Sequence, residues 1–99
     1  MTKVNVVMEE NNQHLTLIKA TNGVVLNLAK NQFQQTVDVE DELKKGQMLY
    51  VLIKYTDDDS YVTGASIHED KIQQKYEQSL AKADHTFEIQ SIEYKQTAV

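Results

Sequence analysis

Ser66, His68 and Asp70 are the residues of this sequence whose types come nearest to a catalytic group. A hydroxyl, an imidazole and a carboxylate can hydrolyse an acyl bond, but they must converge from separate segments, so that the hydroxyl meets one ring nitrogen and the carboxylate the other. A spacing of two residues does not produce that convergence. Ser66 also precedes Glu69 by three residues, the spacing of a capping box at the start of a helix. We therefore assign Ser66 to a helix cap and expect a protein without catalytic residues, not an enzyme.

The candidates for metal ligands are three histidines and a run of three aspartates. His14, His68 and His85 lie far apart and show neither HxH nor HxxxH spacing. A carboxylate such as Asp84 could complete a set, yet each histidine is better explained as a half-exposed surface group. The run Asp57-Asp58-Asp59 lacks the alternating ligands, the glycine and the final glutamate of a calcium loop. We expect no metal site and no cofactor, and we interpret the run as a charged hairpin tip, with cation binding as the open alternative.

Four of the five tyrosines are candidates for a binding surface, because tyrosine packs a large apolar body while its hydroxyl stays in water. Tyr50 and Tyr55 belong to one apolar stretch, Tyr61 begins the next segment, and Tyr94 lies near the end of the chain. The simplest interpretation places them at the edge of the core. The functional interpretation makes them, together with His68, residues of an interface or of a ligand pocket.

Composition narrows the classes of function. The chain has 99 residues, a formal charge of −5 and a sequence pI near 5.0, and all its basic residues are lysines. Nucleic-acid surfaces normally carry a basic stripe with arginines that fork onto phosphates, so nucleic-acid binding is disfavoured. Cysteine is absent, the N-terminal segment lacks the apolar core of a signal peptide, and no apolar run approaches the length of a membrane span. We expect one domain over residues 1–99, a cytoplasmic location and no membrane partner.

The stretch from Gly46 to Tyr55 is the one around which the rest of the chain is organised. Every residue from Met48 to Ile53 is apolar or aromatic, and turn residues bound the stretch at about eight residues, the length of a strand. A strand without alternation of polar and apolar residues is covered on both faces. We therefore expect a central strand here.

Shorter alternating patterns precede this stretch. Val4, Val6 and Met8 share one face of a first strand, which a polar loop at 9–13 connects to a second strand at 14–20.

The next segments contain a turn signal and two further strands. Asn22-Gly23 between apolar runs is the strongest short-range hairpin signal, so the second strand should pair with a third from Val24 to Leu28. Residues 30–42 fit either a short edge strand or an extended loop. Residues 61–67 predict another strand, in which Gly64 marks a bulge, a bend or a close approach.

The last third of the chain predicts a helix and a final strand. The helix covers about residues 67–82, and a narrow apolar stripe at helical spacing follows one side of it: Ile72, Tyr76, Leu80 and Ala83. The strand covers about residues 86–94. Its apolar residues change parity halfway, which indicates either a bulge near Gln90-Ser91 or cover on both faces.

These elements predict a mainly β (α+β) fold: five to seven short antiparallel strands forming a small barrel or a curved sheet, with one surface helix and a C-terminal strand. From Lys3 to Leu80 the order of strands, the turn Lys45-Gly46-Gln47, the acidic turn and the polar helix resembles a family of very small bacterial β-barrel domains, SH3-like or OB-like, of unknown function. The resemblance implies a barrel-like fold and a bacterial origin. It transfers no functional residue, because the family carries no assigned chemistry.

Three hypotheses of function follow. The first is a non-enzymatic protein-interaction or regulatory module whose partner is another protein or a second copy of the chain, as a homodimer or larger homo-oligomer. The second is a small-ligand-binding protein with a pocket lined by Tyr50, Tyr55 and Tyr61 and anchored by His68. The third is single-stranded nucleic-acid binding on a barrel face, which would need lysine and aromatic side chains mixed on one surface.

Overall fold

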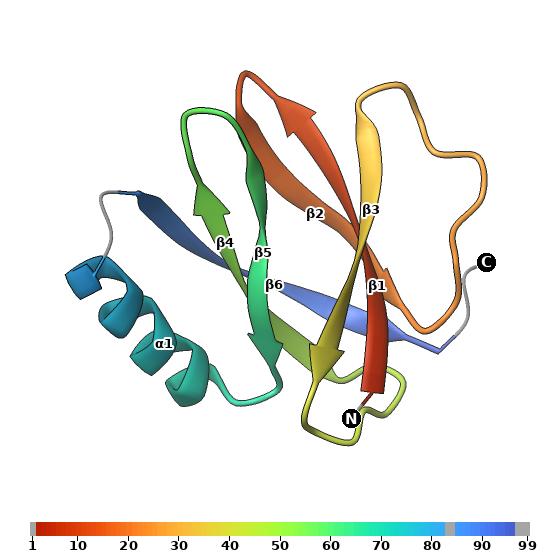
Figure 1. Ribbon diagram of the computed structural model, residues 1–99. Coiled ribbons are helices and arrows are strands. Elements are labelled where there is room, and N and C mark those ends of the chain that lie inside the picture. The colour runs from red at the N-terminus through yellow and green to blue at the C-terminus, as the bar shows by residue number, and fades with distance from the viewer. Residues whose placement is uncertain (1, 83–84, 97–99) are drawn as a thin grey trace.

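A computed structural model describes residues 2–82 and 85–96 of the chain, which form one curved sheet and one helix (Figure 1). The elements are β1 (Thr2–Asn11), β2 (His14–Thr21), β3 (Gln32–Val39), β4 (Met48–Tyr55), β5 (Ser60–Ser66), α1 (Glu69–Lys82) and β6 (Thr86–Lys95). The strands are hydrogen-bonded in the order β3-β1-β2-β6-β4-β5, and the sheet curls until its end strands, β3 and β5, lie side by side. This nearly closed barrel with one helix and a C-terminal strand confirms the predicted fold class.

The strand pairings depart from the prediction at one place. β1 pairs with β2 and β3, and β4 pairs with β5 and β6, all in antiparallel orientation. β2 instead pairs with β6 in parallel, through Ala20 with Tyr94 and Thr21 with Lys95. Parallel neighbours need a long connection, and here it contains β3, β4, β5 and α1. The prediction of antiparallel strands alone was therefore wrong for this pair.

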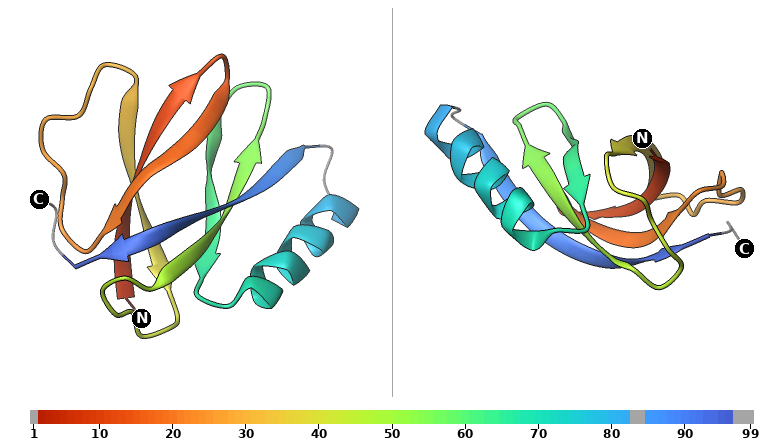
Figure 2. Two further views of the ribbon diagram at one scale, coloured as in Figure 1. Left: turned by 180° about the vertical axis from the view of Figure 1, so that it is seen from behind. Right: turned by 90° about the horizontal axis from the view of Figure 1, so that it is seen from below.

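Two apolar clusters form on the two faces of the sheet. The larger one fills the interior of the barrel, and the smaller one, around Leu52, Ile72 and Phe87, lies between the sheet and α1. β4 contributes to both, because Val51 and Ile53 belong to the interior while Leu52 packs on the helix side. Figure 2 shows the helix lying along the outside of this end of the sheet. β4 is thus covered on both faces, as predicted, but it lies next to the end strand β5 and not at the centre of the sheet.

β6 also contributes side chains to both clusters, and the strand contains no bulge where it pairs with β4. It pairs with β4 in unbroken register. Phe87 and Ile89 pack on the helix side, whereas Ile92 and Tyr94 pack against the interior cluster. Cover on both faces therefore explains the change of parity, and the alternative bulge near Gln90-Ser91 was wrong.

The tight hairpin turn lies at Asn12 and Gln13, not at Asn22 and Gly23. Asn12 and Gln13 have positive φ angles of 52° and 67°, the backbone that a type I′ turn requires, whereas Asn22 and Gly23 do not have positive φ. The turn joins β1 directly to β2, so the polar loop predicted at 9–13 shrinks to two residues.

Residues 24–28 form a loop instead of the predicted third strand. β2, with which they would have to pair, already has β1 on one side and β6 on the other near its end. Val24 and Leu26 consequently remain exposed. The strand that pairs with β1 is β3, and it places Val37 and Val39 in the core. Of the two alternatives predicted for residues 30–42, the edge strand is therefore the one that forms.

α1 begins at Glu69, and Ser66 is not its cap. Ser66 ends β5, where its hydroxyl donates to the Asp41 carboxylate at 3.0 Å and accepts from the His68 N–H at 3.0 Å. The carbonyl of His68 accepts the first amides of the helix instead. The predicted capping box was wrong because the Ser66 hydroxyl bonds to Asp41 and to the His68 N–H, which precedes the helix. It does not bond to an amide of the first turn.

The apolar stripe of α1 is buried at its beginning only. Ile72 is buried and Tyr76 is half-buried, but Leu80 is 45% exposed, and Ala83 lies outside the described residues. Within the described residues, no helix has the length and apolar character needed to cross a bilayer.

Gly64 marks both a bulge and a close approach, as predicted. The register of β4 and β5 shifts between Leu52 and Ile53, so Thr63 has no residue opposite it on β4, although its hydroxyl donates to the Leu52 carbonyl at 3.4 Å. The Lys75 side chain of α1 lies over the glycine, 2.5 Å from where a Cβ would stand, and its Nζ donates to the Thr63 carbonyl at 3.1 Å. A side chain at position 64 would displace this lysine.

The two ends of the sheet meet through a side chain. Among the described residues, the hydrogen bonds between β3 and β5 are those of the Gln35 carboxamide, which donates to the Val62 carbonyl at 2.7 Å and accepts from the Val62 N–H at 2.9 Å. Gln34 binds the carbonyl and N–H of Val25, in the loop after β2, in the same way at 3.1 and 2.9 Å. Two neighbouring glutamines thus satisfy backbone groups that no strand pairs.

Candidate functional site

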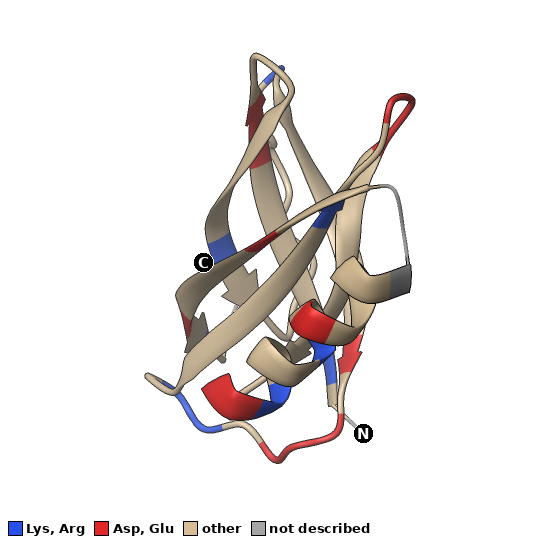
Figure 3. Cartoon of the chain, turned by 90° about the vertical axis from the view of Figure 1, so that its left-hand side faces the viewer, with Lys and Arg blue, Asp and Glu red and all other residues tan. Residues whose placement is uncertain are grey.

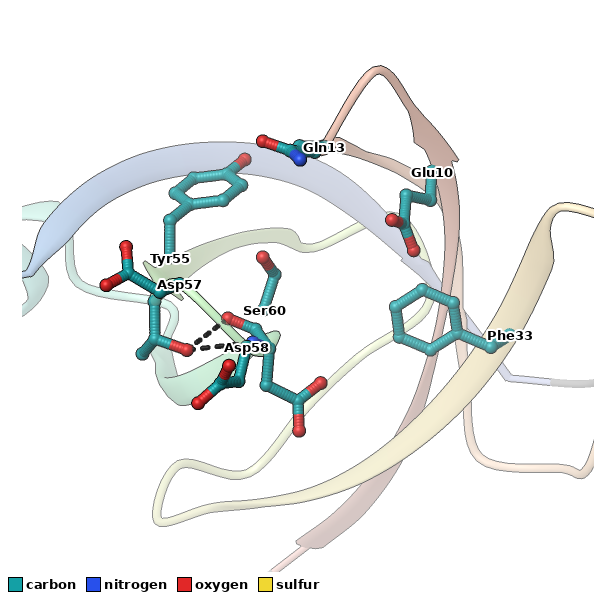
Figure 4. A pocket seen from close by; sticks show the side chains of 9 residues that line it. Glu10, Gln13, Phe33, Tyr55, Asp57, Asp58 and Ser60 are labelled. Atoms are coloured by element: carbon teal, nitrogen blue, oxygen red, sulfur yellow. Dashed lines mark hydrogen bonds between the residues drawn. The ribbon is translucent and has the colours of Figure 1, made fainter.

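A pocket of about 420 Å3 opens at one end of the barrel, between the β1–β2 turn, the start of β3 and the β4–β5 hairpin. We call it the mouth pocket. Figure 4 shows Tyr55 and Phe33 on opposite sides of it, with Glu10 and Gln13 along one edge and Asp57, Asp58 and Ser60 along another. Its full lining is Glu10, Gln13, Phe33, Tyr55, Thr56, Asp57, Asp58, Asp59 and Ser60.

A local hydrogen-bond pattern presents the three aspartates at the pocket. The Thr56 hydroxyl donates to the Asp59 carbonyl at 2.7 Å and accepts from the Asp59 N–H at 2.8 Å. The Thr56 N–H also donates to that carbonyl, at 2.8 Å. This closed turn leaves Asp57 and Asp58 exposed at its tip. The predicted charged hairpin tip is thus part of the pocket wall.

The mouth pocket concentrates negative charge. Its wall contains four carboxylates, one from the end of β1 and three from the hairpin tip. Figure 3 shows these acidic segments at the same end of the molecule. The ion pairs found within residues 2–82 and 85–96 use other carboxylates, those of Asp38, Asp41 and Glu88. The pocket therefore favours a positively charged group.

Tyr55 is the fixed wall of the pocket. Its hydroxyl donates to the Glu88 carboxylate at 2.7 Å and accepts from the Leu15 N–H at 3.2 Å, and its ring stacks on His14 with centroids 5.9 Å apart. Burial, followed by the hydrogen bond to Glu88 and its charge, raises the pKa of Tyr55 to about 12. The tyrosine is therefore neutral at physiological pH. Its hydrogen bonds and its stacking on His14 hold the ring in one place.

A polar network behind Tyr55 connects β2 to β6 where these strands diverge. The Gln90 carboxamide accepts from the Leu17 N–H at 3.0 Å and donates to the Leu15 carbonyl at 2.6 Å and to Glu88 at 2.7 Å. Glu88 also binds His14 at 3.0 Å. Burial alone would raise the pKa of Glu88, but hydrogen bonds from His14, Tyr55 and Gln90 outweigh it and lower that pKa.

The structure does not bring the tyrosine candidates together. Tyr55 lines the mouth pocket, whereas Tyr50 packs in the cluster beneath α1. Tyr61 is exposed, with the Lys54 ammonium 5.9 Å from its ring centre. Tyr94 is 3% exposed in the interior, and its main chain bonds to Gly46 and Gln47.

Of the residues considered for catalysis and metal binding, only the aspartate run lines the pocket, and Ser66, His68 and Asp70 lie away from it. His68 is exposed, and its Nε2 lies 3.5 Å from Asp41, whose other oxygen binds the Ser66 hydroxyl and the Ile67 N–H. Burial would raise the pKa of Asp41, but these hydrogen bonds and the nearby His68 and Lys71 lower it. In the part of the chain that the structure describes, no three potential ligands form a metal site. Asp84 lies outside that part.

Sequence reasoning missed Glu10, Gln13 and Phe33. Each comes from a segment that was interpreted as a loop or left between a strand and a loop, and only the curl of the sheet brings them to the hairpin tip. The one available signal was Phe33, a single aromatic residue among glutamines on a polar segment.

Comparisons with protein-family models, with curated proteins and with solved structures gave no match to this chain.

Proposed function

We propose that the protein is a non-enzymatic interaction module that binds a cationic side chain of a protein partner in the mouth pocket. The observation that supports this most directly is the combination of two aromatic rings with four carboxylates around one cavity. An aromatic face attracts a cation by about 0.5–2 kcal/mol. A carboxylate about 4 Å from the cation adds about 1 kcal/mol in water and about 4 kcal/mol where the effective dielectric constant is 20.

The charge of the whole chain favours the same partner. A formal charge of −5 accelerates the approach of basic proteins and repels the phosphates of a nucleic acid. A pocket of about 420 Å3 also has the size of a site for a small ligand, so a free amine is the alternative occupant. Self-association stays a prediction, and the mouth pocket does not require it.

Fluorescence anisotropy with a labelled peptide of alternating glycine and lysine tests the proposal. Asp58→Asn removes one pocket carboxylate and should weaken binding about fivefold, which corresponds to about 1 kcal/mol. The matched control is Asp70→Asn, which makes the same charge change in the first turn of α1. This variant should bind as the wild type does. Phe33→Leu, which keeps an apolar side chain but removes the ring, should weaken binding to a similar extent as Asp58→Asn.

Equal weakening by Asp58→Asn and Asp70→Asn would show that the peptide senses only net charge, and the pocket would lose its role. The same peptide with glutamate in place of lysine provides the second control, and it should not bind.

A further inference from the structure

The seam between β3 and β5 provides an interaction surface of a different kind. β3 and β5 are the end strands of the sheet, and no backbone hydrogen bond joins them within the described residues. We propose that an extended, basic peptide segment of a partner adds as a strand along β5 at this seam, where it replaces the Gln35 side chain on Val62.

The hydrogen bonds of Val62 define the geometry of the added strand. Gln35 offers one carboxamide that accepts from the Val62 N–H at 2.9 Å and donates to its carbonyl at 2.7 Å. A residue in an antiparallel ladder receives both bonds from a single opposite residue in the same way, whereas a parallel neighbour spreads them over two residues. The glutamine therefore occupies the position of an antiparallel partner, and the incoming strand runs antiparallel to β5.

The mouth pocket and the bulge set the two ends of the site. The pocket separates Phe33 of β3 from Ser60 of β5, so the seam is open at that end. At the other end the bulge at Thr63 interrupts the regular strand, and Lys75 already bonds to the Thr63 carbonyl. The paired segment is consequently short, opposite residues 60–62, and the affinity of an isolated peptide is modest.

Strand periodicity then predicts the sequence pattern of the peptide. Val62 is buried, so the residue opposite it also points into the barrel and is apolar. The residue two positions later lies opposite Ser60, on the same face, and its side chain reaches the mouth pocket. We expect lysine or arginine at this second position, and this choice rests on the proposed function. The addition of a strand does not depend on it, because it is inferred from the hydrogen bonds of Val62.

Charge complementarity favours a basic peptide over a second copy of the chain. The mouth end of the seam carries the four pocket carboxylates, and Asp38, Glu40 and Asp41 line a groove at the other end beside Lys71 and Lys75. A second copy would bring a net charge of −5 against this surface. Strand addition by a basic segment instead combines main-chain hydrogen bonds with neutralisation of the carboxylates.

The test uses a capped, fluorescent peptide of alternating threonine and valine that has one lysine two positions after its central valine. Two further peptides carry an N-methyl group on that valine or a glutamine in place of the lysine. Gln35→Ala should bind the parent peptide about tenfold more tightly than the wild type or better, because two intramolecular hydrogen bonds no longer compete. Gln34→Ala is the matched control, because the adjacent residue makes the same pair of bonds to Val25, away from the seam.

N-methylation should abolish binding to every variant, and the amide signal of Val62 in 1H–15N spectra should shift with the parent peptide but not with the N-methylated one. Gln35→Glu provides a second variant should Gln35→Ala fail to fold, because it keeps an acceptor for the Val62 N–H but loses the donor to its carbonyl. Its affinity should lie between those of the wild type and Gln35→Ala.

The possible failures are distinguishable. Undiminished binding of the N-methylated peptide would overturn strand addition, while sensitivity to Asp58→Asn would still support the pocket. Loss of binding on N-methylation, without any effect of the lysine or of Asp58→Asn, would support the strand and contradict the proposed function. Concentration-dependent dimers of Gln35→Ala in light scattering without peptide would identify a second copy as the occupant and overturn the proposal of a peptide partner.

Discussion

Replacing Tyr55 with phenylalanine should lower the free energy of unfolding by about 2 kcal/mol. The substitution keeps the ring but removes the hydroxyl, which donates to Glu88 at 2.7 Å and accepts from the Leu15 N–H at 3.2 Å. A hydrogen bond to a charged group contributes about 1.5–3 kcal/mol and a neutral one about 0.5–1.5 kcal/mol. The Glu88 side chain is 35% exposed, so water replaces part of the loss and the sum lies near the lower end.

Urea unfolding at neutral pH measures this loss, and Tyr61→Phe provides the control, because the exposed Tyr61 has no comparable anchor. For a domain of about 100 residues, 2 kcal/mol corresponds to a decrease of about 8–16 °C in Tm. Equal stability of Tyr55→Phe and Tyr61→Phe would refute the role assigned to the hydroxyl.

The pH dependence provides an independent check of the same network. Because the pKa of Glu88 is lowered in the folded state, its ionised form stabilises the fold above the ordinary carboxyl pKa, and this stabilisation is lost as the pH falls through the lowered value. The wild type should therefore lose more stability on acidification than Tyr55→Phe does. A difference between the two proteins that stays constant down to about pH 2 would contradict the argument.

Three further variants test other contacts. Gly64→Ala should destabilise the protein by about 1 kcal/mol in thermal melts, since the new Cβ would meet the Lys75 side chain, and Lys75→Ala in the same chain should remove most of that penalty. Gln13→Gly should stabilise the fold by about 0.5–1 kcal/mol in urea, because Gln13 has a φ of 67°, which glycine adopts without strain. Asp41→Ala should cost about 1–3 kcal/mol and accelerate hydrogen exchange at the start of α1, whereas the exposed neighbour Glu42→Ala should change neither.

The elements that could be predicted from the sequence are those whose burial follows from their own composition. The run from Met48 to Ile53 is apolar or aromatic at every position, a pattern typical of a strand covered on both sides, and its residues from Leu49 to Ile53 pack in the two clusters. The alternation of Val4, Val6 and Met8 likewise requires one buried face, which the structure provides.

The errors arose where an element depends on which edge of a distant strand is free. Residues 24–28 have the composition of a strand, but β6, which comes more than 50 residues later in the chain, occupies the edge they would have used. The mouth pocket has the same origin. Glu10, Phe33 and Asp58 become neighbours only through the curl of the sheet, and no spacing along the sequence reports that curl.

The order of strands also has a consequence for how the chain folds. β6 lies between the group of β1, β2 and β3 and the hairpin of β4 and β5, and it is the last strand in the sequence. During synthesis, each group can pair internally, but no ladder joins the two until residue 95 has emerged from the ribosome. The joining step closes loops of more than 60 residues, so it should be slow and rate-limiting. Until then, the interior of the half-formed barrel remains open to water and to other chains.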